Sequence, residues 1–295
     1  MAESAAVQPL SNVKAAIGES PLWSPDDQSL YWVDIKNPRV LRYDFRLATL
    51  QTWTMPSEIG AICRADGGRF VVSLRNGVMK FDPATGELDP IVHPEAGRPA
   101  YRLNDSKVDC RGRLLVGSVE DPGFAPDGKL YSIAGASAAI LQDRIAMPNA
   151  LGWSWDWRTL YFADSFQRRI WTYEYDNETG VVGNRRVFAE IPEGEGFPDG
   201  LTVDEVGFVW NAQIDGWQIK RYDPDGRVER VVRLPVRRPT SLTFGGPDYR
   251  TIFITTGTMK LTDEELAAQP LSGCVLVLPS DVRGRPEPIF GVGTQ

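Results

Sequence analysis

The chain of 295 residues has a formal net charge of -7, 42% hydrophobic and 24% charged residues, and one histidine. The acidic balance argues against nucleic acid or a membrane surface as the main partner, and no apolar run reaches the roughly 18 residues of a membrane span. A single histidine, His93, excludes zinc sites of the three-histidine or HExxH type.

The N-terminus and the cysteines indicate the cellular compartment. The first ten residues, MAESAAVQPL, lack the basic start and apolar core of a signal peptide. The three cysteines, Cys63, Cys110 and Cys274, are an odd number in a long chain, so a disulfide framework is not expected. We therefore expect buried thiols that act as small hydrophobic side chains, in a cytoplasmic protein.

The N-terminal segment is predicted to provide one strand. Residues 1–12 are expected to be poorly ordered, and residues 12–17 to form a strand. From there on, a pattern of turn, buried strand and half-buried strand recurs six times, at intervals of roughly 35–50 residues, which is typical of propeller blades. The six turns of this pattern lie around Asp26, Ala65, Val108, Trp155, Asp204 and Gly245.

The fifth copy shows a complete unit of four strands. Strands are predicted at 201–203, 208–212, 217–222 and 227–234. Residues 198–200 and 223–226 are predicted to be turns, because proline fixes φ and glycine accepts a positive φ. Four short antiparallel strands joined by tight turns form one propeller blade.

The sequence therefore predicts an all-β fold, a six-bladed β-propeller with four antiparallel strands per blade, as a single domain over residues 1–295. The N-terminal strand is expected to join the last blade and close the ring, which leaves no long edge exposed. One short surface helix is predicted at 262–269, with Thr262 as its N-cap.

Polar residues recur where the blades begin. Glu19, Asn149 and Asp199 each stand immediately before the first strand of a blade, and Arg102 and Asn104 share one face of an extended segment at the start of the third blade. In a propeller, these positions face one end of the central channel, around which the blades are arranged. Carboxylate and amide oxygens without histidine or cysteine favour a hard cation, Ca²⁺ first and Mg²⁺ or Mn²⁺ next, and so few protein ligands leave room for water and substrate.

Five motifs in this order resemble the gluconolactonase family, which includes regucalcin (senescence marker protein) and luciferin-regenerating enzyme. The motifs are Gly18–Trp23, Arg102–Asp109, Leu160–Ser165, Pro198–Leu201 and Phe244–Asp248. Together they span nearly the whole chain. The resemblance implies a six-bladed propeller that holds one divalent cation and hydrolyses sugar-acid lactones.

The resemblance also implies residue roles. Glu19, Asn149 and Asp199 would be the metal ligands, Asp199 would also be the catalytic general base, and Arg102 and Asn104 would bind substrate. Calcium is the expected cation, with zinc, manganese, magnesium or iron as alternatives. A carboxylate bound to a dication is a weak base, so either the free oxygen of Asp199 assists or the metal supplies a hydroxide.

The chain departs from the family pattern at two places. Ala150 follows Asn149 where the family often has glycine, so the backbone there visits a positive φ less freely. The loop after Val119 is short. We expect Glu120 to supply the substrate-binding acid of this loop, while Asp121 is the alternative.

The predicted function is that of a metal-dependent sugar lactonase, a monomer or weak homodimer whose partner is a small sugar lactone. One alternative is an esterase or phosphotriesterase of the same fold, which an apolar channel mouth would favour. The tryptophans considered for such a mouth are Trp153, Trp155, Trp157 and Trp217. The other alternative is a non-catalytic propeller that binds a protein.

Overall fold

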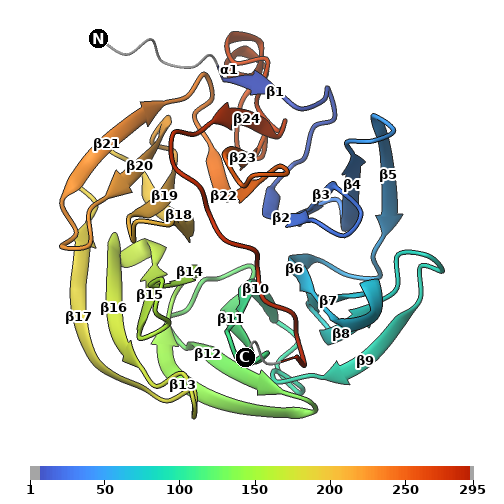
Figure 1. The fold of residues 1–295 in the computed structure, drawn as a ribbon, viewed down its shortest axis with the longest axis vertical. Coiled ribbons are helices and arrows are strands. Elements are labelled where there is room, and N and C mark those ends of the chain that lie inside the picture. The colour runs from blue at the N-terminus through green and yellow to red at the C-terminus, as the bar shows by residue number, and fades with distance from the viewer. Residues whose placement is uncertain (1–6, 293–295) are drawn as a thin grey trace.

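The computed structural model describes residues 7–292 and arranges them as six four-stranded antiparallel sheets around a central channel (Figure 1). In five sheets the first strand lies at the channel and the chain then runs outward to the rim, while in the sixth the outermost strand comes from the N-terminus. This confirms the predicted six-bladed β-propeller.

In blades one to three the strands follow one another from the channel outward. Blade one holds β2 (Gly18–Ser24), β3 (Ser29–Asp34), β4 (Arg39–Asp44) and β5 (Thr49–Thr54). Blade two holds β6 (Ile59–Arg64), β7 (Phe70–Leu74), β8 (Gly77–Phe81) and β9 (Leu88–Val92). Blade three holds β10 (Tyr101–Val108), β11 (Leu114–Glu120), β12 (Gly128–Ala134) and β13 (Ser137–Ile145).

Blades four to six repeat the arrangement. Blade four holds β14 (Pro148–Trp153), β15 (Thr159–Asp164), β16 (Arg169–Tyr175) and β17 (Val182–Glu190). Blade five holds β18 (Phe197–Val203), β19 (Val209–Ile214), β20 (Gln218–Tyr222) and β21 (Val228–Arg233). Blade six holds β22 (Pro239–Gly245), β23 (Thr251–Thr256), β24 (Leu276–Pro279) and β1 (Gln8–Pro9).

The N-terminal strand closes the ring as predicted, but its position differs from the prediction. β1 pairs with β24, with Gln8 opposite Val277 and Pro9 opposite Leu276. Residues 12–17 form no strand of a sheet, because their amides are taken by other groups. The Ala15 amide donates to Gly273 O, and those of Ala16 and Ile17 donate to the carboxylate of Asp34. Residues 1–6 of the segment expected to be poorly ordered lie outside the described residues.

The hydrophobic core is divided among the interfaces between blades. Each of the six clusters found among residues 7–292 joins side chains of two neighbouring blades. The largest completely buried side chains, Trp32 and Trp210, belong to two of them. The three cysteines are buried, in agreement with their predicted packing role. Because the clusters lie between blades, they fix how neighbouring inner strands sit beside one another.

The predicted helix is present on the surface as α1 (Asp263–Ala268). Thr262 and Glu265 form a reciprocal capping box, in which each side chain accepts a hydrogen bond from the other's backbone amide. Within the described part of the chain, no helix is long and apolar enough to span a membrane.

The C-terminal segment crosses one end of the channel. After β24 the chain runs over the middle of the ring toward β10 and β11 (Figure 1). Arg283 binds Glu205 of blade five, Arg285 donates to Trp153 O of blade four, and Glu287 accepts from Lys107 of blade three. We call residues 280–292 the C-terminal strap. It covers the end of the channel opposite the starts of the inner strands.

The strap ends at Phe290, which packs between blades two and three. Its ring is 8% exposed and belongs to the cluster with Cys63 and Val108, and its amide donates to Arg64 O at 2.8 Å. We expect Phe290→Ala to lower the free energy of unfolding by roughly 3 kcal/mol, because it removes a buried ring and leaves a cavity. Urea denaturation followed by circular dichroism measures this. Phe166→Ala, at a residue that is 48% exposed, is the control, and a loss in Phe290→Ala no larger than that of the control would contradict the predicted packing role of Phe290.

Candidate functional site

The polar residues expected at the blade starts come together at the end of the channel that the strap leaves uncovered. Glu19, Arg102, Asn104, Asn149 and Asp199 are each 8% exposed or less, and all lie within the first four residues of an inner strand. A buried set of this kind is costly unless its members satisfy one another or bind a ligand. The set therefore marks a candidate site.

Every inner strand has a register shift close to its start, and this shift sets the direction of the site residues. The shifts lie between Glu19 and Leu22 in β2, between Leu103 and Ser106 in β10, and between Asn149 and Gly152 in β14. β6, β18 and β22 have equivalent shifts. Such a bulge breaks the strict alternation of side chains and re-aims them. Residues 198–200, predicted to be a turn, thus lie inside β18 at its bulge.

The bulges force unusual backbone conformations beside the site. Ser20 has φ 49° and Ala150 has φ 59°, so the residues that follow Glu19 and Asn149 both adopt the left-handed region, which is strained for non-glycine residues. Ala150 therefore adopts the positive φ expected to be difficult for it. After Asp199 the residue is Gly200, where a Cβ would lie 2.0 Å from Ser241 Oγ, so only glycine fits against β22.

A directed chain of hydrogen bonds connects the polar residues of three blades. Arg102 Nη1 donates to Asn104 Oδ1 at 2.6 Å, and Asn104 Nδ2 donates to Asn149 Oδ1 at 2.8 Å. Asn149 Nδ2 then donates to Ser165 Oγ at 2.8 Å, and the Ser165 hydroxyl donates to Pro198 O at 2.6 Å. Because a guanidinium only donates, the first bond fixes the orientation of both amides. Asn149 Oδ1 is thereby held toward Asn104, with a second lone pair left for a ligand.

Asn104 has no N–H group left for a substrate. Its second Nδ2 hydrogen bond goes to Pro148 O at 2.8 Å. Arg102 can still donate hydrogen bonds to a substrate. Its Nε donates to Asp121 and its Nη1 donates to Asn104 and Leu103 O, while Nη2 has no hydrogen-bond partner among the described residues. Of this predicted pair, Arg102 is thus the one that can donate to a substrate oxygen.

The short loop after β11 brings Asp121 to the site and turns Glu120 away. Asp121 Oδ2 accepts from Arg102 Nε at 2.6 Å and from Lys36 Nζ at 2.8 Å. The half-buried Glu120 instead accepts from the Ala125 amide within its own loop, at 3.0 Å. Burial favours a higher pKa for Asp121, but the bonds from Lys36 and Arg102 outweigh it and hold that pKa below its usual range. The structure therefore joins Asp121, not Glu120, to the cluster.

Three carboxylates are buried at the channel axis. Burial raises the pKa of Glu19 well above its ordinary value, and repulsion from Asp199 and Asp105 adds to this. Burial likewise raises the pKa of Asp199, with Asp105 adding repulsion and Arg238 opposing it. Burial also raises the pKa of Asp105, although Lys107 counteracts it. These groups need a positive partner in order to be ionised together.

The donor set fits a cation that prefers oxygen ligands. Glu19 accepts one hydrogen bond, from the Ser20 amide at 2.9 Å, so the two carboxylates retain lone pairs, and Asn149 Oδ1 adds an amide oxygen. Over residues 7–292, histidine, cysteine, aspartate and glutamate do not gather in a group of three or more that could hold a metal. The donor set of Glu19, Asp199 and Asn149 differs from such a group, because it combines two carboxylates with one amide oxygen.

Several residues of the site have no role in the sequence-based prediction. Asp105, Ser165 and Arg238 are buried beside the predicted residues. Asp105 and Ser165 belong to motifs that resemble the family, and Arg238 stands directly before β22, as Glu19 stands at the start of β2. Position within the repeat was thus the available signal for Arg238. The exposed His93 follows the outer strand β9, away from the channel.

The tryptophans considered for an apolar channel mouth lie mostly at the other end. Trp153 is the last residue of β14, and Arg285 of the strap stacks on Trp157 at 3.7 Å from the ring centre. Arg285 also donates to Trp155 O. Only Trp217, in the loop between β19 and β20, stands at the end where the site residues lie, and it is 41% exposed.

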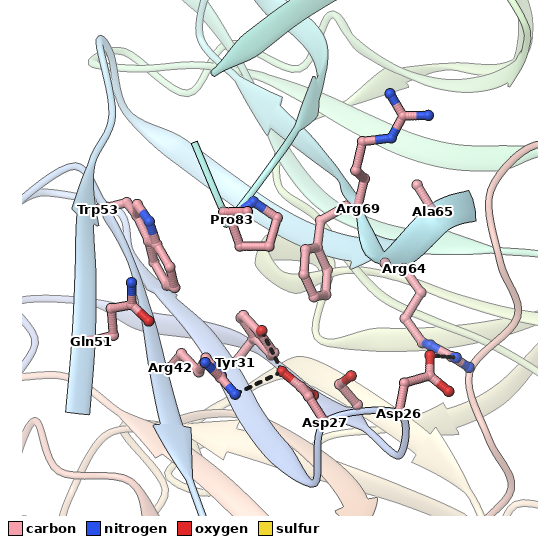
Figure 2. Close-up of a pocket in the computed structure, with 14 residues that line it drawn as sticks. Asp26, Asp27, Tyr31, Arg42, Gln51, Trp53, Arg64, Ala65, Arg69 and Pro83 are labelled. Atoms are coloured by element: carbon pink, nitrogen blue, oxygen red, sulfur yellow. Dashed lines mark hydrogen bonds and ion pairs between the residues drawn. The ribbon is translucent and has the colours of Figure 1, made fainter. Parts of the chain in front are cut away.

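A groove of about 420 Å³ lies away from the site, between blades one and two (Figure 2). Trp53, Tyr31 and Phe70 are among the residues that line it. Its charges are already paired, since Arg42 binds Asp27 and Arg64 binds Asp26. It holds none of the predicted site residues.

Comparisons with known proteins show what the whole chain is similar to. The family model of the SMP-30/Gluconolactonase/LRE-like region matches residues 17–258. The 6-deoxy-6-sulfogluconolactonase of Pseudomonas putida is 36% identical over 94% of this chain and 95% of its own. The pentonolactonase XacC of Haloferax volcanii is 32% identical over 92% and 93%. The crystal structure of a calcium-binding protein, regucalcin, from Agrobacterium tumefaciens has a TM-score of 0.94 at 26% identity, with 97% of both chains covered.

The repulsion among the buried carboxylates predicts a pH-dependent stability. The pKa of Glu19 is raised in the folded protein, so in chelator-treated protein stability falls as pH rises from the unfolded value of about 4.3 through the folded one. Glu19→Gln removes this penalty. We expect it to unfold at a higher temperature than wild type at pH 7, by about 2–4 °C per kcal/mol relieved, with no gain below about pH 4.

Thermal unfolding followed by circular dichroism across pH 3.5–8 checks this. Glu193→Gln, at an exposed loop position, is the matched control and should show no gain. A Glu19→Gln protein that is no more stable than wild type at pH 7 would contradict the electrostatic argument.

Proposed function

The chain belongs to the SMP-30/gluconolactonase/LRE-like family, and we propose on this basis that it is a sugar lactonase, which opens the cyclic ester of an aldonic acid. The observation that carries the proposal is the buried cluster of Glu19, Asn149 and Asp199 beside Arg102 at the uncovered end of the channel. Two of the relatives are named as lactonases of sugar acids.

We also propose one divalent cation, held by Glu19, Asn149 and Asp199. Two buried carboxylates balance a dication, and the hydrogen-bond chain directs the oxygen of Asn149 away from Ser165. Calcium suits oxygen ligands best, and the regucalcin structure is that of a calcium-binding protein; zinc, manganese, magnesium or iron would also bind such a set. When bound, the cation supplies Lewis acidity to the lactone carbonyl.

The protein groups then have separate tasks. The Nη2 group of Arg102 donates to an oxygen of the lactone and to the oxyanion that forms from its carbonyl. An oxygen of Asp199 takes a proton from the attacking water as that water adds to the carbonyl carbon. The bond between the carbonyl carbon and the ring oxygen breaks, and the ring oxygen receives the proton. Lactone and water thus give one open-chain hydroxy acid.

Arg102 acts from a fixed position. Asp121 holds Nε, and Asn104 holds Nη1. Lys36 links Asp121 to blade two, because its Nζ donates both to Asp121 and, at 2.6 Å, to the carboxylate of Glu58. An arginine that is clamped in this way loses little freedom when substrate binds.

One observation favours a second candidate, the hydrolysis of less polar esters. Phe124, Phe166 and Phe197 form an aromatic arc at the channel mouth, with ring centres 5.6 Å and 6.4 Å apart. Such an arc packs against the C–H face of a sugar and equally against an aryl group. Rates on an aryl ester and on a sugar lactone distinguish the two candidates.

The first test is the hydrolysis of a panel of aldonolactones by chelator-stripped protein, with each divalent cation added back. We expect cation-restored turnover of one or more lactones above the enzyme-free rate. Asp199→Asn, which keeps the size of the side chain but not its charge, should reduce kcat by roughly 10²–10⁴-fold. A pH-stat measures the acid released.

Asp225→Asn, at an exposed turn on the outer side of blade five, is the matched control and should retain full activity. If no lactone is hydrolysed with any cation, the proposed function is wrong. If Asp199→Asn remains as active as wild type, Asp199 is not the base.

The hydrogen-bond chain predicts a role for Ser165 in cation binding. Its hydroxyl accepts from Asn149 and donates to Pro198 O, so Ser165→Ala frees the Asn149 amide to rotate. Loss of such a supporting partner typically weakens metal binding by about 10–100-fold. Isothermal titration of the apo-protein with Ca²⁺ or Mn²⁺ measures this without an activity assay.

Ser118→Ala provides the matched control, because Ser118 is also buried, donates to Glu95 and accepts from the Lys129 amide. We expect both variants to lose stability but only Ser165→Ala to lose cation affinity. Unchanged affinity in Ser165→Ala would show that Asn149 is not held by this serine or is not a ligand.

A further inference from the structure

A second buried guanidinium lies at the uncovered end of the channel. Arg238 stands directly before β22 in blade six, and it is 8% exposed. Its charge lowers the pKa of Asp199 against the effect of burial. Arg102 lies in blade three, which is opposite blade six in the ring (Figure 1). The two guanidinium groups therefore flank the carboxylates from opposite sides.

Arg238 has far fewer partners than the other buried arginines. Arg64, Arg102 and Arg221 each contact a carboxylate at 2.6–2.7 Å. The contact of Arg238 is with Asp215 Oδ1 at 3.3 Å, an oxygen that also lies 3.1 Å from Arg237 Nε. Among the described residues, the Arg238 guanidinium makes no hydrogen bond, and Asp215 Oδ1 accepts none.

Although the Arg238 side chain is largely buried, its guanidinium nitrogens are not enclosed, so these unused donors remain accessible to a ligand. A guanidinium presents five N–H groups in a planar fork, which fits the several oxygens of an oxyanion better than the single oxygen of a hydroxyl group. An oxyanion also brings no donor of its own that would need a partner. The unused donors thus indicate an anionic ligand group.

We propose that Arg238 binds an anionic substituent of the substrate, so that the preferred lactone carries a sulfonate, phosphate or carboxylate group on the carbon farthest from its carbonyl. The inference rests on the proposed lactonase function and specifies its substrate class. Arg102 serves the reacting end of the substrate, and Arg238 serves the far end. Arg238 is thus a specificity-determining residue.

The test compares D-glucono-1,5-lactone with its 6-phosphate and 6-sulfonate derivatives, for wild type and for Arg238→Gln. We expect wild type to favour the anionic lactones in kcat/KM by at least tenfold. Arg238→Gln should lose about 10–100-fold on these, mainly through KM, which is the effect of one or two charge-assisted hydrogen bonds. On the neutral lactone the loss should be at least tenfold smaller, because there only the effect of the Arg238 charge on Asp199 is removed, and Arg238→Lys should recover part of the preference.

Arg237→Gln is the matched control, because Arg237 is the neighbouring arginine and hydrogen-bonds Glu265 at 2.9 Å. It should leave the ratio between anionic and neutral lactones unchanged. A wild-type protein that prefers the neutral lactone, or an Arg238→Gln protein impaired equally on all three, would overturn the inference. If wild type hydrolyses another lactone of the aldonolactone panel but none of these three, the inference alone fails, and if it hydrolyses no lactone at all, the proposed function fails.

A binding measurement keeps the inference testable even if the variants do not fold. Calorimetry of the wild-type protein with gluconate and with 6-phosphogluconate needs no turnover. We expect at least tenfold tighter binding of 6-phosphogluconate, and weaker binding as salt concentration rises. Equal affinity for the two acids would overturn the inference.

Discussion

The register shift at the start of each inner strand is the constraint on which the candidate site depends. In an unbroken strand, side chains alternate strictly between the two faces. The extra residue in β2, β10, β14 and β18 breaks this alternation where Glu19, Asn104, Asn149 and Asp199 stand. Left-handed backbone at Ser20 and Ala150 accompanies it, and such strain persists only where the surroundings enforce it. Here the surroundings are the hydrophobic clusters between the blades, which hold neighbouring inner strands against one another.

Both ends of the chain stabilise that arrangement. β1 completes the sheet of the last blade, so the ring has no open seam there. The strap crosses the opposite end of the channel and binds several blades through Arg283, Arg285 and Glu287. A ring tied in this way resists the opening of any one interface between blades, and so it helps to hold the polar residues at the other end in place. The hydrogen-bond chain from Arg102 to Pro198 O shows the result, because it links three blades through bonds of 2.6–2.8 Å.

The sequence was sufficient for the blades because their signals are local. Alternating apolar residues and Asp- or Gly-containing turns specify each strand and hairpin, and six repeats specify the ring. Bulges are set by contacts between strands, so residues 198–200 looked like a turn although they lie within β18. Periodicity also did not show that Glu120 bonds back to its own loop while Asp121 reaches Arg102, since that choice depends on the path of a short loop. Ser165 and Arg238 are common surface residue types. A family-like motif and a position in the repeat pointed to them only weakly, and their burial beside other polar groups distinguishes them.

The mouth of the channel divides into regions of different chemistry. Blades one to three contribute the charged network of Lys36, Glu58 and Asp121, which holds Arg102. Blades three to five contribute the aromatic arc, and blade six contributes Arg238 with its unused donors. At the floor of the mouth, the hydrogen-bond chain holds the amides of Asn104 and Asn149, and the carboxylates of Glu19 and Asp199 repel each other. A change at one of these residues therefore disturbs its neighbours. Arg238 and the three phenylalanines, which stand at the edge of the mouth, are connected to that floor by few bonds. If the proposed function holds, we expect replacement of Arg238 or the phenylalanines to change the substrate preference while the geometry of the floor stays in place.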